Sequence, residues 1–325
     1  MKWAIAGYGD VVVRRVLPAL RALGEEPVRL WGRDPLRAAR TAELFGIPSV
    51  AAAPGELLGG ADGVDALYVA TPVVHHVPLT AAGLRAGLHV LVEKPLAGTL
   101  RRGGAGLDGT GPGCAGAAYY RRLAPAVAAV RRQLRDWRPD RVEVRFRSAF
   151  APGPAHPMAW RTDPAVSGGG VLADAGSHRL DLLLTLFGTP TTVRARLTRR
   201  FPSGAERRAE VVLEWPRGLR AHCLTEWDHQ APPMDLLTMT GGGRTLTLDP
   251  LDSGRLCVTT AHGTRRQVLP PAANPHQPLI ADFRTAATTG RPPVCPLPEA
   301  VLVDAVLVAA ERSDARGGRP VPVRP

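Results

Sequence analysis

The sequence contains few lysines and few aromatic residues. Only two of its 41 lysine and arginine residues are lysines, Lys2 and Lys94. Aromatic residues make up 5% of the chain, too few for a stacking platform, and the arginines are dispersed rather than gathered on one recognition helix. The net charge of +12 therefore does not predict a nucleic-acid partner. A phosphorylated cofactor or an anionic substrate suits this charge equally well.

Cysteine clusters and long apolar runs are also missing. The four cysteines lie far apart without a CxxC pair, which argues against a zinc site and a disulfide framework. No apolar run approaches the ~18 residues that span a bilayer, and the first residues lack the regions of a signal peptide. We therefore expect no metal, no membrane partner and a cytoplasmic location. The length of 325 residues predicts two domains.

Lys94 stands out against the scarcity of lysine. It follows an apolar, β-branched run, His89–Val92, that is typical of a strand and ends before Pro95. Arginine stays protonated in proteins, whereas burial and neighbouring charges can tune a lysine to give or take a proton near neutral pH. Lys94 is therefore a candidate acid or base. The alternative is a solvated lysine at a sheet edge.

A glycine turn follows the first predicted strand, residues 1–6. The turn is Gly7-Tyr8-Gly9-Asp10-Val11, and an apolar-periodic helix follows it to residue 23. This order of strand, turn and helix predicts a dinucleotide site, in which Gly7 permits the tight turn and Gly9 lets a pyrophosphate approach the helix N-terminus. The third motif position is Val12 instead of glycine or alanine. Glycine turns also occur without a ligand.

The second predicted strand, residues 27–31, ends without the acid that holds the ribose of NAD. Gly32 occupies that position, with Arg33 next and Arg37 one helical turn further on. Arginine there accommodates the 2′-phosphate of NADP, so NADP(H) is preferred over NAD(H). Alternatively, Arg33 is a solvated loop residue and Asp34 caps the helix that starts at Pro35. Both interpretations can hold together.

Further strands (residues 47–52 and 65–70) alternate with helices (35–45 and 77–86), which predicts a doubly wound parallel sheet. Ligands bind beyond the carboxyl ends of such strands. The residues expected there are Thr71, Pro72, His76, Glu93, Lys94 and Pro95.

The second half of the chain has a different pattern. Short alternating runs from residue 141 to 269, separated by Gly and Pro, predict a mainly antiparallel sheet. The expected architecture is α/β: a Rossmann domain over residues 1–120, then an α+β domain with a large open sheet over residues 121–325. Two closing helices are expected at 278–288 and 298–312.

A predicted helix within this second domain carries Asp174, His178 and Asp181. Residues four apart share a helix face, so Asp174 and His178 point the same way. A carboxylate beside an imidazole fixes its tautomer and supports the cation that forms when it accepts a proton. The alternative is a structural ion pair at Asp174 and a core histidine at His178.

Taken together, these motifs resemble the glucose-fructose oxidoreductase, inositol dehydrogenase and rhizopine-catabolism (Gfo/Idh/MocA) family of NAD(P)-dependent sugar oxidoreductases. The resemblance covers nearly the whole chain. It rests on the glycine turn, Ala70-Thr-Pro with His76, Glu93-Lys94-Pro95, residues 120–125, the run from Ser167-Gly-Gly-Gly through Asp174 to His178 and Asp181, and residues 310–321. Two features depart from the family: the glycine-rich segment 101–113 replaces a regular helix, and Val73 replaces an asparagine.

The resemblance implies hydride transfer at a secondary alcohol or ketone of a sugar, aminosugar or cyclitol. It assigns the substrate carbinol to Lys94, Asp174 and His178. We favour His178 as the proton-transfer group, Asp174 as its orienting partner and Lys94 as the group that polarises the oxygen; the converse role for Lys94 stays open.

Weaker candidates for the substrate rim are Tyr120, Arg122, Trp160 and Arg161, although Trp160 suits the core and Arg122 the surface equally well. A homodimer or homotetramer is expected from the broad second-domain sheet. Two alternatives remain: a non-catalytic NADP- and sugar-binding regulator, and an NAD-dependent glycoside-cleaving relative.

Overall fold

The computed structural model describes residues 1–59, 63–100, 107 and 113–324. The glycine-rich segment predicted to lack a stable helix therefore lies largely outside the described residues, at 101–106 and 108–112. The chain forms two compact units. The first contains Met1–Ala97, Arg102–Tyr120 and Ala272–Val301, and the second contains Gly98–Arg101, Arg121–Pro271 and Leu302–Pro325.

The first unit is built on a parallel sheet, as predicted. In the described part of the chain its six strands have the order β3-β2-β1-β4-β5-β6, and every neighbouring pair is parallel. Its core comes from continuous apolar runs such as Trp3–Ala6 and Ala66–Val69, which are fully buried because both faces of the sheet are covered. The strands are β1 (Lys2–Ala6), β2 (Glu26–Trp31), β3 (Ser49–Val50), β4 (Ala66–Val69), β5 (His89–Val92) and β6 (Ala115–Ala117).

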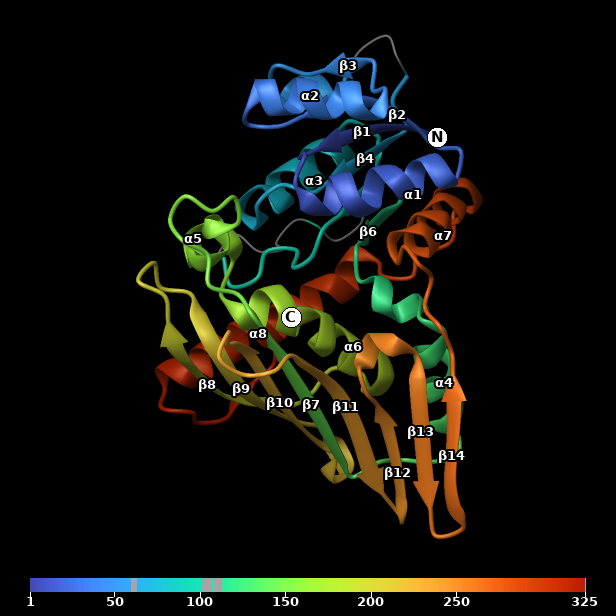
Figure 1. Cartoon of the computed structure of the whole chain (residues 1–325), viewed down its shortest axis with the longest axis vertical. Helices are drawn as coiled ribbons and strands as arrows, with labels where there is room; N and C mark the ends of the chain where they lie inside the picture. The colour runs from blue at the N-terminus through green and yellow to red at the C-terminus, as the bar shows by residue number, and fades with distance from the viewer. Residues whose placement is uncertain (60–62, 101–106, 108–112, 325) are drawn as a thin grey trace. The chain divides into compact units, whose positions relative to one another are not determined.

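Helices connect these strands close to their predicted positions. They are α1 (Leu17–Ala22), α2 (Pro35–Phe45) and α3 (His76–Arg85) (Figure 1). Asp34 caps α2 as predicted: its carboxylate accepts from the Leu36 and Arg37 amides at 3.0 and 3.1 Å, and Pro35 is the first helical residue. Strand β6 was not predicted, because its three residues, Ala-Gly-Ala, carry no strand signal.

The helix α7 (His276–Thr289) belongs to the first unit, although the sequence placed it in the second domain. It lies beside α1 (Figure 1). The Phe283 ring lies 5.8 Å from the Trp3 ring, and Arg284 pairs with the buried Glu25 at 3.1 Å. These contacts join α7 to β1 and to the start of β2, so a boundary at residue 120 leaves out part of the first unit. Long-range side-chain pairing of this kind leaves no local signal in the sequence.

The second unit is built on a larger sheet with the order β14-β13-β12-β11-β7-β10-β9-β8-β15 in the described residues. Only β7 and β10 pair in parallel among these strands, so the predicted, mainly antiparallel sheet is confirmed. The strands are β7 (Arg141–Ser148), β8 (Thr192–Arg200), β9 (Glu206–Glu214), β10 (Arg220–Trp227), β11 (Met234–Gly241), β12 (Arg244–Leu248), β13 (Arg255–Thr260), β14 (Gly263–Val268) and β15 (Val321–Pro322).

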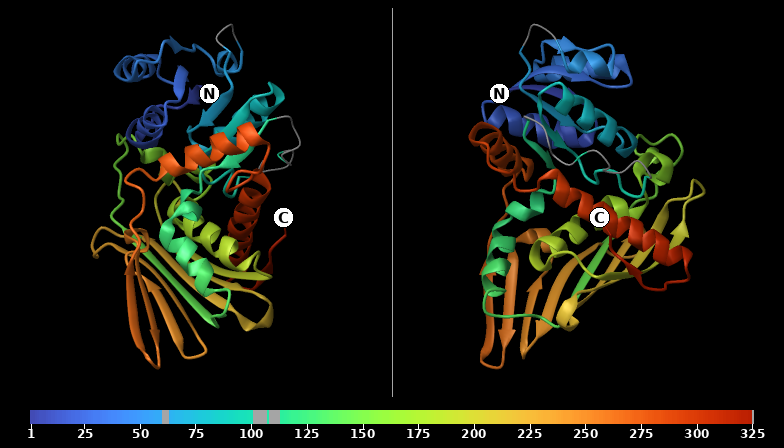
Figure 2. Two further views of the ribbon diagram at one scale, coloured as in Figure 1. Left: turned by 90° about the vertical axis from the view of Figure 1, so that its right-hand side faces the viewer. Right: turned by 180° about the vertical axis from the view of Figure 1, so that it is seen from behind.

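Helices cover one face of this large sheet and leave the other open (Figure 2). The covering helices are α4 (Pro125–Gln133), α6 (Ser177–Phe187) and the part of α8 (Leu297–Ala315) that follows residue 301. Alternate strand residues face these helices, and Ala209, Val211 and Leu213 of β9 are fully buried. None of the helices in the described residues is long and apolar enough to span a membrane.

Candidate active site

The first glycine of the turn after β1 is required by the backbone. Gly7 has φ +113°, and a Cβ built on it would lie 2.4 Å from the carbonyl oxygen of Ala70. The Gly7 amide donates to the Trp31 carbonyl at 2.7 Å. Gly7 therefore brings the ends of β1, β2 and β4 together, and this closeness excludes any side chain.

The second glycine faces open space. Gly9 is exposed, and no heavy atom lies within 4 Å of a Cβ built on it. The chain is helical from Asp10 onward, and the Gly9 carbonyl accepts from the Val12 and Val13 amides at 3.0 and 3.1 Å. The N-terminus of this helix, which is the positive end of its dipole, thus lies next to the exposed backbone of Gly9. This arrangement fits an anionic group such as a pyrophosphate.

The helix after the turn becomes π-helical two residues after its start, in the segment η1 (Val12–Val16). Val12, which replaces the third small residue of the motif, is fully buried at its first position. Asp10 is exposed and lies 3.6 Å from Arg14, while Val11 is half-buried. The structure thus accommodates the larger side chain within a wider helical turn, and π-helical turns of this kind are frequent at functional sites.

Tyr8 explains why glycine follows β2. A Cβ on Gly32 would lie 1.9 Å from the Tyr8 ring, so the ring occupies the space of a side chain at that position. The Tyr8 hydroxyl accepts from the Asp34 amide at 2.9 Å, and the Arg37 guanidinium lies 5.0 Å from the centre of the ring. Arg33 is exposed. This end of the site is aromatic and basic instead of acidic.

His76 links the ends of β4 and β5. Its Nδ1 lies 2.9 Å from the Pro95 carbonyl oxygen, and its Nε2 lies 2.8 Å from that of Thr71. Burial lowers the pKa of His76, although both carbonyls act in the opposite direction. Because both ring nitrogens face backbone carbonyls, His76 holds the two strand ends. The direct cofactor contact predicted for His76 stays a prediction.

Thr71 and Pro72 follow β4 and are half-buried. The Thr71 hydroxyl oxygen is itself buried, and it has no hydrogen-bond partner among the residues that the structure describes. A buried hydroxyl without a partner is costly, and a bound ligand can satisfy it. Together with the open backbone at Gly9, this hydroxyl fits a nicotinamide dinucleotide at the carboxyl edge of the sheet.

Glu93 lies in a buried hydrogen-bonded network beside Lys94. Its Oε1 accepts from the Tyr68 hydroxyl at 2.9 Å and lies 3.1 Å from Nε2 of His276. Burial raises the pKa of Glu93, but the hydrogen bond and charge of His276, the charge of Lys94 and the Tyr68 hydroxyl outweigh it and lower the pKa to about 2. Glu93 is thus an ionised carboxylate next to the half-buried Lys94. Nothing in the sequence identified Tyr68 or His276 as its partners.

The second unit holds the remaining candidates on one helical segment. Asp174 belongs to the π-helical turn η6 (Leu172–Gly176), and His178 lies at the start of α6. The predicted helix is present, but its first turn is π-helical instead of α-helical. Asp174 is half-buried and lies 3.2 Å from Nη1 of Arg161, and His178 is 8% exposed.

Glu206 of β9 anchors the start of this segment. Its carboxylate accepts from the Gly170 and Leu172 amides at 2.9 and 3.0 Å. Burial raises the pKa of Glu206, although these amides oppose the shift. A Cβ on Gly170 would lie 2.2 Å from the Glu206 carbonyl oxygen, so the glycine run allows this close approach. The sequence gave no indication of Glu206, because it lies 32 residues after Asp174.

The residues predicted for the substrate rim lie at three places. Arg161 and Trp160 are neighbours on η5 (Ala159–Thr162), with the guanidinium 5.5 Å from the indole centre, and Arg161 contacts Asp174. Arg122, in contrast, is buried and forms a two-pronged ion pair with the fully buried Asp181, with its Nε 2.9 Å from Oδ1. Arg122 therefore fastens its segment to α6, and the alternative of a surface charge is incorrect for it; its place at the substrate rim stays a prediction. Tyr120 lies in the first unit beside His276.

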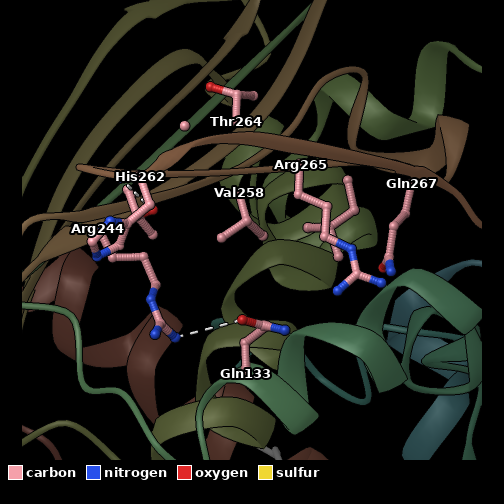
Figure 3. Close-up of a pocket in the computed structure, with 10 residues that line it drawn as sticks. Gln133, Arg244, Val258, His262, Thr264, Arg265 and Gln267 are labelled. Atoms are coloured by element: carbon pink, nitrogen blue, oxygen red, sulfur yellow. Dashed lines mark hydrogen bonds between the residues drawn. The ribbon is translucent and has the colours of Figure 1, made fainter.

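A cavity of about 400 Å³ lies elsewhere in the second unit, between α4 and strands β12–β14 (Figure 3). Gln133 and Arg244, which are hydrogen-bonded at 3.5 Å, line it together with Val258, His262 and Arg265. None of the predicted site residues lines this cavity. The candidate site is therefore defined by the chemistry of its residues.

Comparison with known families agrees with the motifs. Residues 1–105 match the oxidoreductase family with an NAD-binding Rossmann fold, GFO_IDH_MocA, and residues 138–244 match the GFO/IDH/MocA C-terminal domain. The chain belongs to the Gfo/Idh/MocA family. It is an oxidoreductase with an NAD(P)-binding Rossmann domain, so the resemblance predicted from the sequence is confirmed.

Individual relatives include sugar dehydrogenases and reductases. The chain is 35% identical to 1,5-anhydro-D-fructose reductase of Ensifer adhaerens over 56% of this chain and 55% of that protein. It is 27% identical to D-xylose 1-dehydrogenase (NADP(+)) 2 of Haloferax volcanii over 97% of this chain and 99% of that protein. The aligned part thus spans about half of the first relative and nearly all of the second.

The solved structures show the same fold. Levoglucosan dehydrogenase in complex with NADH and levoglucosan aligns over the whole of both chains with a TM-score of 0.89 and 20% identity. An oxidoreductase domain protein from Kribbella flavida aligns over 99% of both chains with a TM-score of 0.85 and 22% identity. At these identities the likeness establishes the architecture and leaves the substrate open.

Proposed function

We propose that this oxidoreductase transfers a hydride between NADP(H) and a secondary alcohol or ketone of a sugar, aminosugar or cyclitol. The observation that carries the proposal is the open glycine turn, together with the Thr71 hydroxyl, which has no partner among the described residues and lies at the same sheet edge as Lys94. The names of the two sugar-acting relatives support the substrate class.

The chain's own residues would handle the proton. When bound, the nicotinamide cofactor supplies or accepts the hydride. In alcohol oxidation His178 takes the proton of the substrate hydroxyl, Asp174 orients the His178 imidazole, and Lys94 polarises the substrate oxygen. Ketone reduction uses the same groups in reverse. Arg161 suits a sugar hydroxyl, because its buried Nε has no hydrogen-bond partner in the described part of the chain.

Single substitutions test these roles. In a screen of sugars and cyclitols with either nucleotide, His178→Ala and Lys94→Ala should each lower kcat roughly 10²- to 10⁴-fold. The exposed His75→Ala is the control and should keep its rate. A native chain that binds cofactor and sugar but turns over none of them would contradict the enzyme proposal and favour the regulatory alternative.

The preference for NADP(H) is supported by the residues after β2. Gly32 leaves no acid for the ribose hydroxyls. The exposed Arg33 follows it, and the Arg37 guanidinium lies over the Tyr8 ring, so both supply positive charge after β2. In fluorescence titrations NADPH should bind at least about tenfold tighter than NADH, near 1.4 kcal/mol. Arg33→Ala should remove most of this difference, whereas Arg40→Ala, an exposed arginine further along α2, should not. Equal affinities in the native chain would refute the preference.

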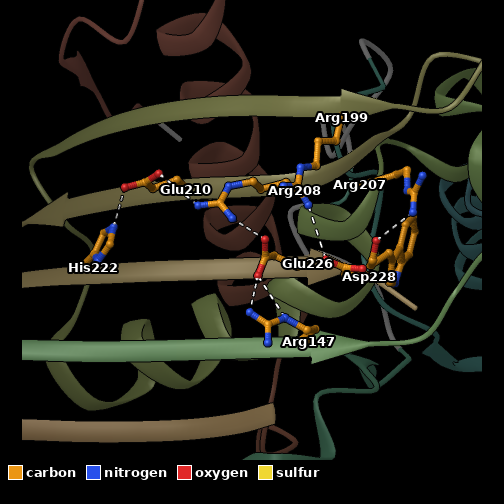
Figure 4. A network of polar contacts seen from close by, with 9 residues as sticks. Arg147, Arg199, Arg207, Arg208, Glu210, His222, Glu226 and Asp228 are labelled. Atoms are coloured by element: carbon orange, nitrogen blue, oxygen red, sulfur yellow. Dashed lines mark hydrogen bonds and ion pairs between the residues drawn. The ribbon is translucent and has the colours of Figure 1, made fainter. Parts of the chain in front are cut away.

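We also propose a homodimer or homotetramer that uses the open face of the large sheet. Figure 4 shows a charged network on this face, where Glu226 contacts Arg147 at 3.0 Å and also pairs with Arg208. His222 and Glu210 add a contact at 3.0 Å. Leu224 lies on the same face between His222 and Glu226. Light scattering should show an oligomer that Leu224→Arg dissociates; a monomeric native protein would overturn the proposal.

A further inference from the structure

The segment Ala272–Val301 follows the second unit along the chain but belongs to the first unit. Near its start lies a short contact region, Asn274–His276. It touches two elements of the proposed cofactor site. Its first residue contacts the helix after the glycine turn, and its last contacts the carboxylate beside Lys94. Nothing in the motifs of the family resemblance includes these two residues.

Asn274 contacts the π-helical turn. Its side-chain amide donates to the carbonyl of Arg15 at 2.7 Å, and its amide oxygen accepts from the His276 amide at 3.0 Å. A π-helical turn departs from the regular pattern of helical hydrogen bonds, so a backbone carbonyl in such a turn is a suitable acceptor for a side-chain donor from outside the helix. Asn274 thus fastens η1 to the start of α7 while it shapes the entry into that helix.

His276 contacts the Glu93 carboxylate from inside the core. The residue is 1% exposed, and its Nε2 lies 3.1 Å from Oε1 of Glu93. Its buried Nδ1 has no hydrogen-bond partner within the described residues. A proton on Nδ1 would create a buried, unsatisfied donor, whereas a proton on Nε2 reaches an ionised acceptor. We therefore assign a proton to Nε2, which donates to the Glu93 carboxylate.

The titratable and charged groups around His276 come from four elements. Glu93 at the end of β5 and Tyr68 of β4 share the carboxylate network, with Lys94 next to Glu93. The Tyr120 ring lies 5.5 Å from the imidazole, and the Arg15 guanidinium of η1 lies 5.9 Å from the Tyr120 ring. The imidazole N–H is therefore a fixed donor that orients Glu93 and, with it, the end of β5.

We propose that Asn274 and His276 are positioning residues of the cofactor site, Asn274 for the glycine-turn helix and His276 for the Glu93–Lys94 strand end. The inference rests on the proposed function. One segment then sets the spacing between the part of the site proposed for the pyrophosphate and the part that carries Lys94.

The two residues should differ in what they control. His276→Phe keeps an aromatic ring but loses the N–H donor, and His276→Gln retains a donor. His276→Phe should lower kcat about tenfold to a hundredfold with little change in NADPH affinity, because misplacing a reacting group costs rate. His276→Gln should recover most of the rate. His262→Phe, at an exposed histidine of the β13–β14 hairpin, is the matched control.

Asn274→Asp tests the other contact. It retains the oxygen that accepts from the His276 amide but loses the donor to Arg15. It should weaken NADPH binding at least about fivefold in a fluorescence titration, while kcat at saturating NADPH stays within about twofold. A purely structural role would instead lower kcat and affinity together in both variants, in proportion to lost stability.

A measurement without cofactor completes the test. Loss of the N–H donor should raise the pKa of Glu93, so acid unfolding of His276→Phe should begin at higher pH than in the native chain. If His276→Phe does not fold, Tyr68→Phe is used instead. It removes the other hydrogen-bond donor to Glu93 and should also lower kcat.

Two failures are distinguishable. The first failure overturns this inference alone: His276→Phe keeps the native kcat and the native acid unfolding, and Asn274→Asp keeps the native NADPH affinity. If His276→Phe does not fold, Tyr68→Phe takes its place in this comparison. A native chain that binds neither NADPH nor NADH overturns the proposed function and this inference with it.

Discussion

Gly7 and Gly9 belong to one motif but have opposite surroundings. Gly7 has a positive φ and lies against the Ala70 carbonyl, whereas Gly9 borders empty space. The sequence predicted both roles because the turn between a strand and a helix restricts where glycine is needed. It missed the Tyr8 ring over Gly32, because that contact joins two loops from different strands.

This contrast predicts two different results. Gly7→Ala should destabilise the protein by at least about 1–3 kcal/mol, since it adds a clash to an unfavourable backbone conformation. Gly9→Ala should leave stability within about 0.5 kcal/mol but weaken NADPH binding, because its methyl group occupies the ligand's approach. Urea unfolding and fluorescence titration measure the two effects. Equal stability losses in both variants would count against an open site at Gly9.

Glu93 gives stability a specific pH dependence. Its pKa is lowered from 4.5 to about 2 in the folded chain. A carboxylate with a lowered pKa stabilises the fold above pH 4.5, and this contribution, roughly 3 kcal/mol, is lost as pH falls toward 2. Glu93→Gln should therefore flatten the loss of stability between pH 5 and 3. Chemical denaturation at several pH values checks this; an unchanged slope would mean that other carboxylates dominate.

At the scale of elements, π-helical turns mark both halves of the candidate site. One follows the glycine turn and the other carries Asp174. The sequence predicted helices at both places, but the spacing of apolar residues does not separate a π-helical turn from an α-helical one. It also gave no sign of Glu206, whose distant carboxylate binds the amides at the start of the second turn.

Glu206 should therefore matter for both stability and turnover. Glu206→Ala leaves two buried amides without their acceptor and should destabilise the protein by about 1–3 kcal/mol. Because the amides precede Asp174, kcat should also fall. Glu206→Gln retains an acceptor oxygen and should lose less of both. Glu43→Ala, at an exposed glutamate of α2, is the control. A Glu206→Ala variant with native kcat would show that the contact of Glu206 with the Gly170 and Leu172 amides does not position Asp174.

At the scale of the whole molecule, the sequence predicted that a parallel sheet is followed along the chain by a mainly antiparallel one, and it predicted most of their strands. The boundary at residue 120 followed from a change of pattern along the chain, which records local periodicity. The return of α7 to the first unit depends instead on pairs such as Trp3 with Phe283 and Glu25 with Arg284. Such pairs are separated by more than 250 residues, so no local pattern reveals them.

The return of α7 predicts that a change late in the chain damages the cofactor unit. Phe283 is 1% exposed and lies against Trp3, so Phe283→Ala should cost about 3–5 kcal/mol of stability. NADPH affinity should fall as well, because the same helix starts at His276, two residues after Asn274. Leu44→Ala, at a residue that is 68% exposed, should change stability by less than about 0.5 kcal/mol. Unchanged NADPH affinity in a clearly destabilised Phe283→Ala would separate α7 from the cofactor site and assign this segment to stability alone.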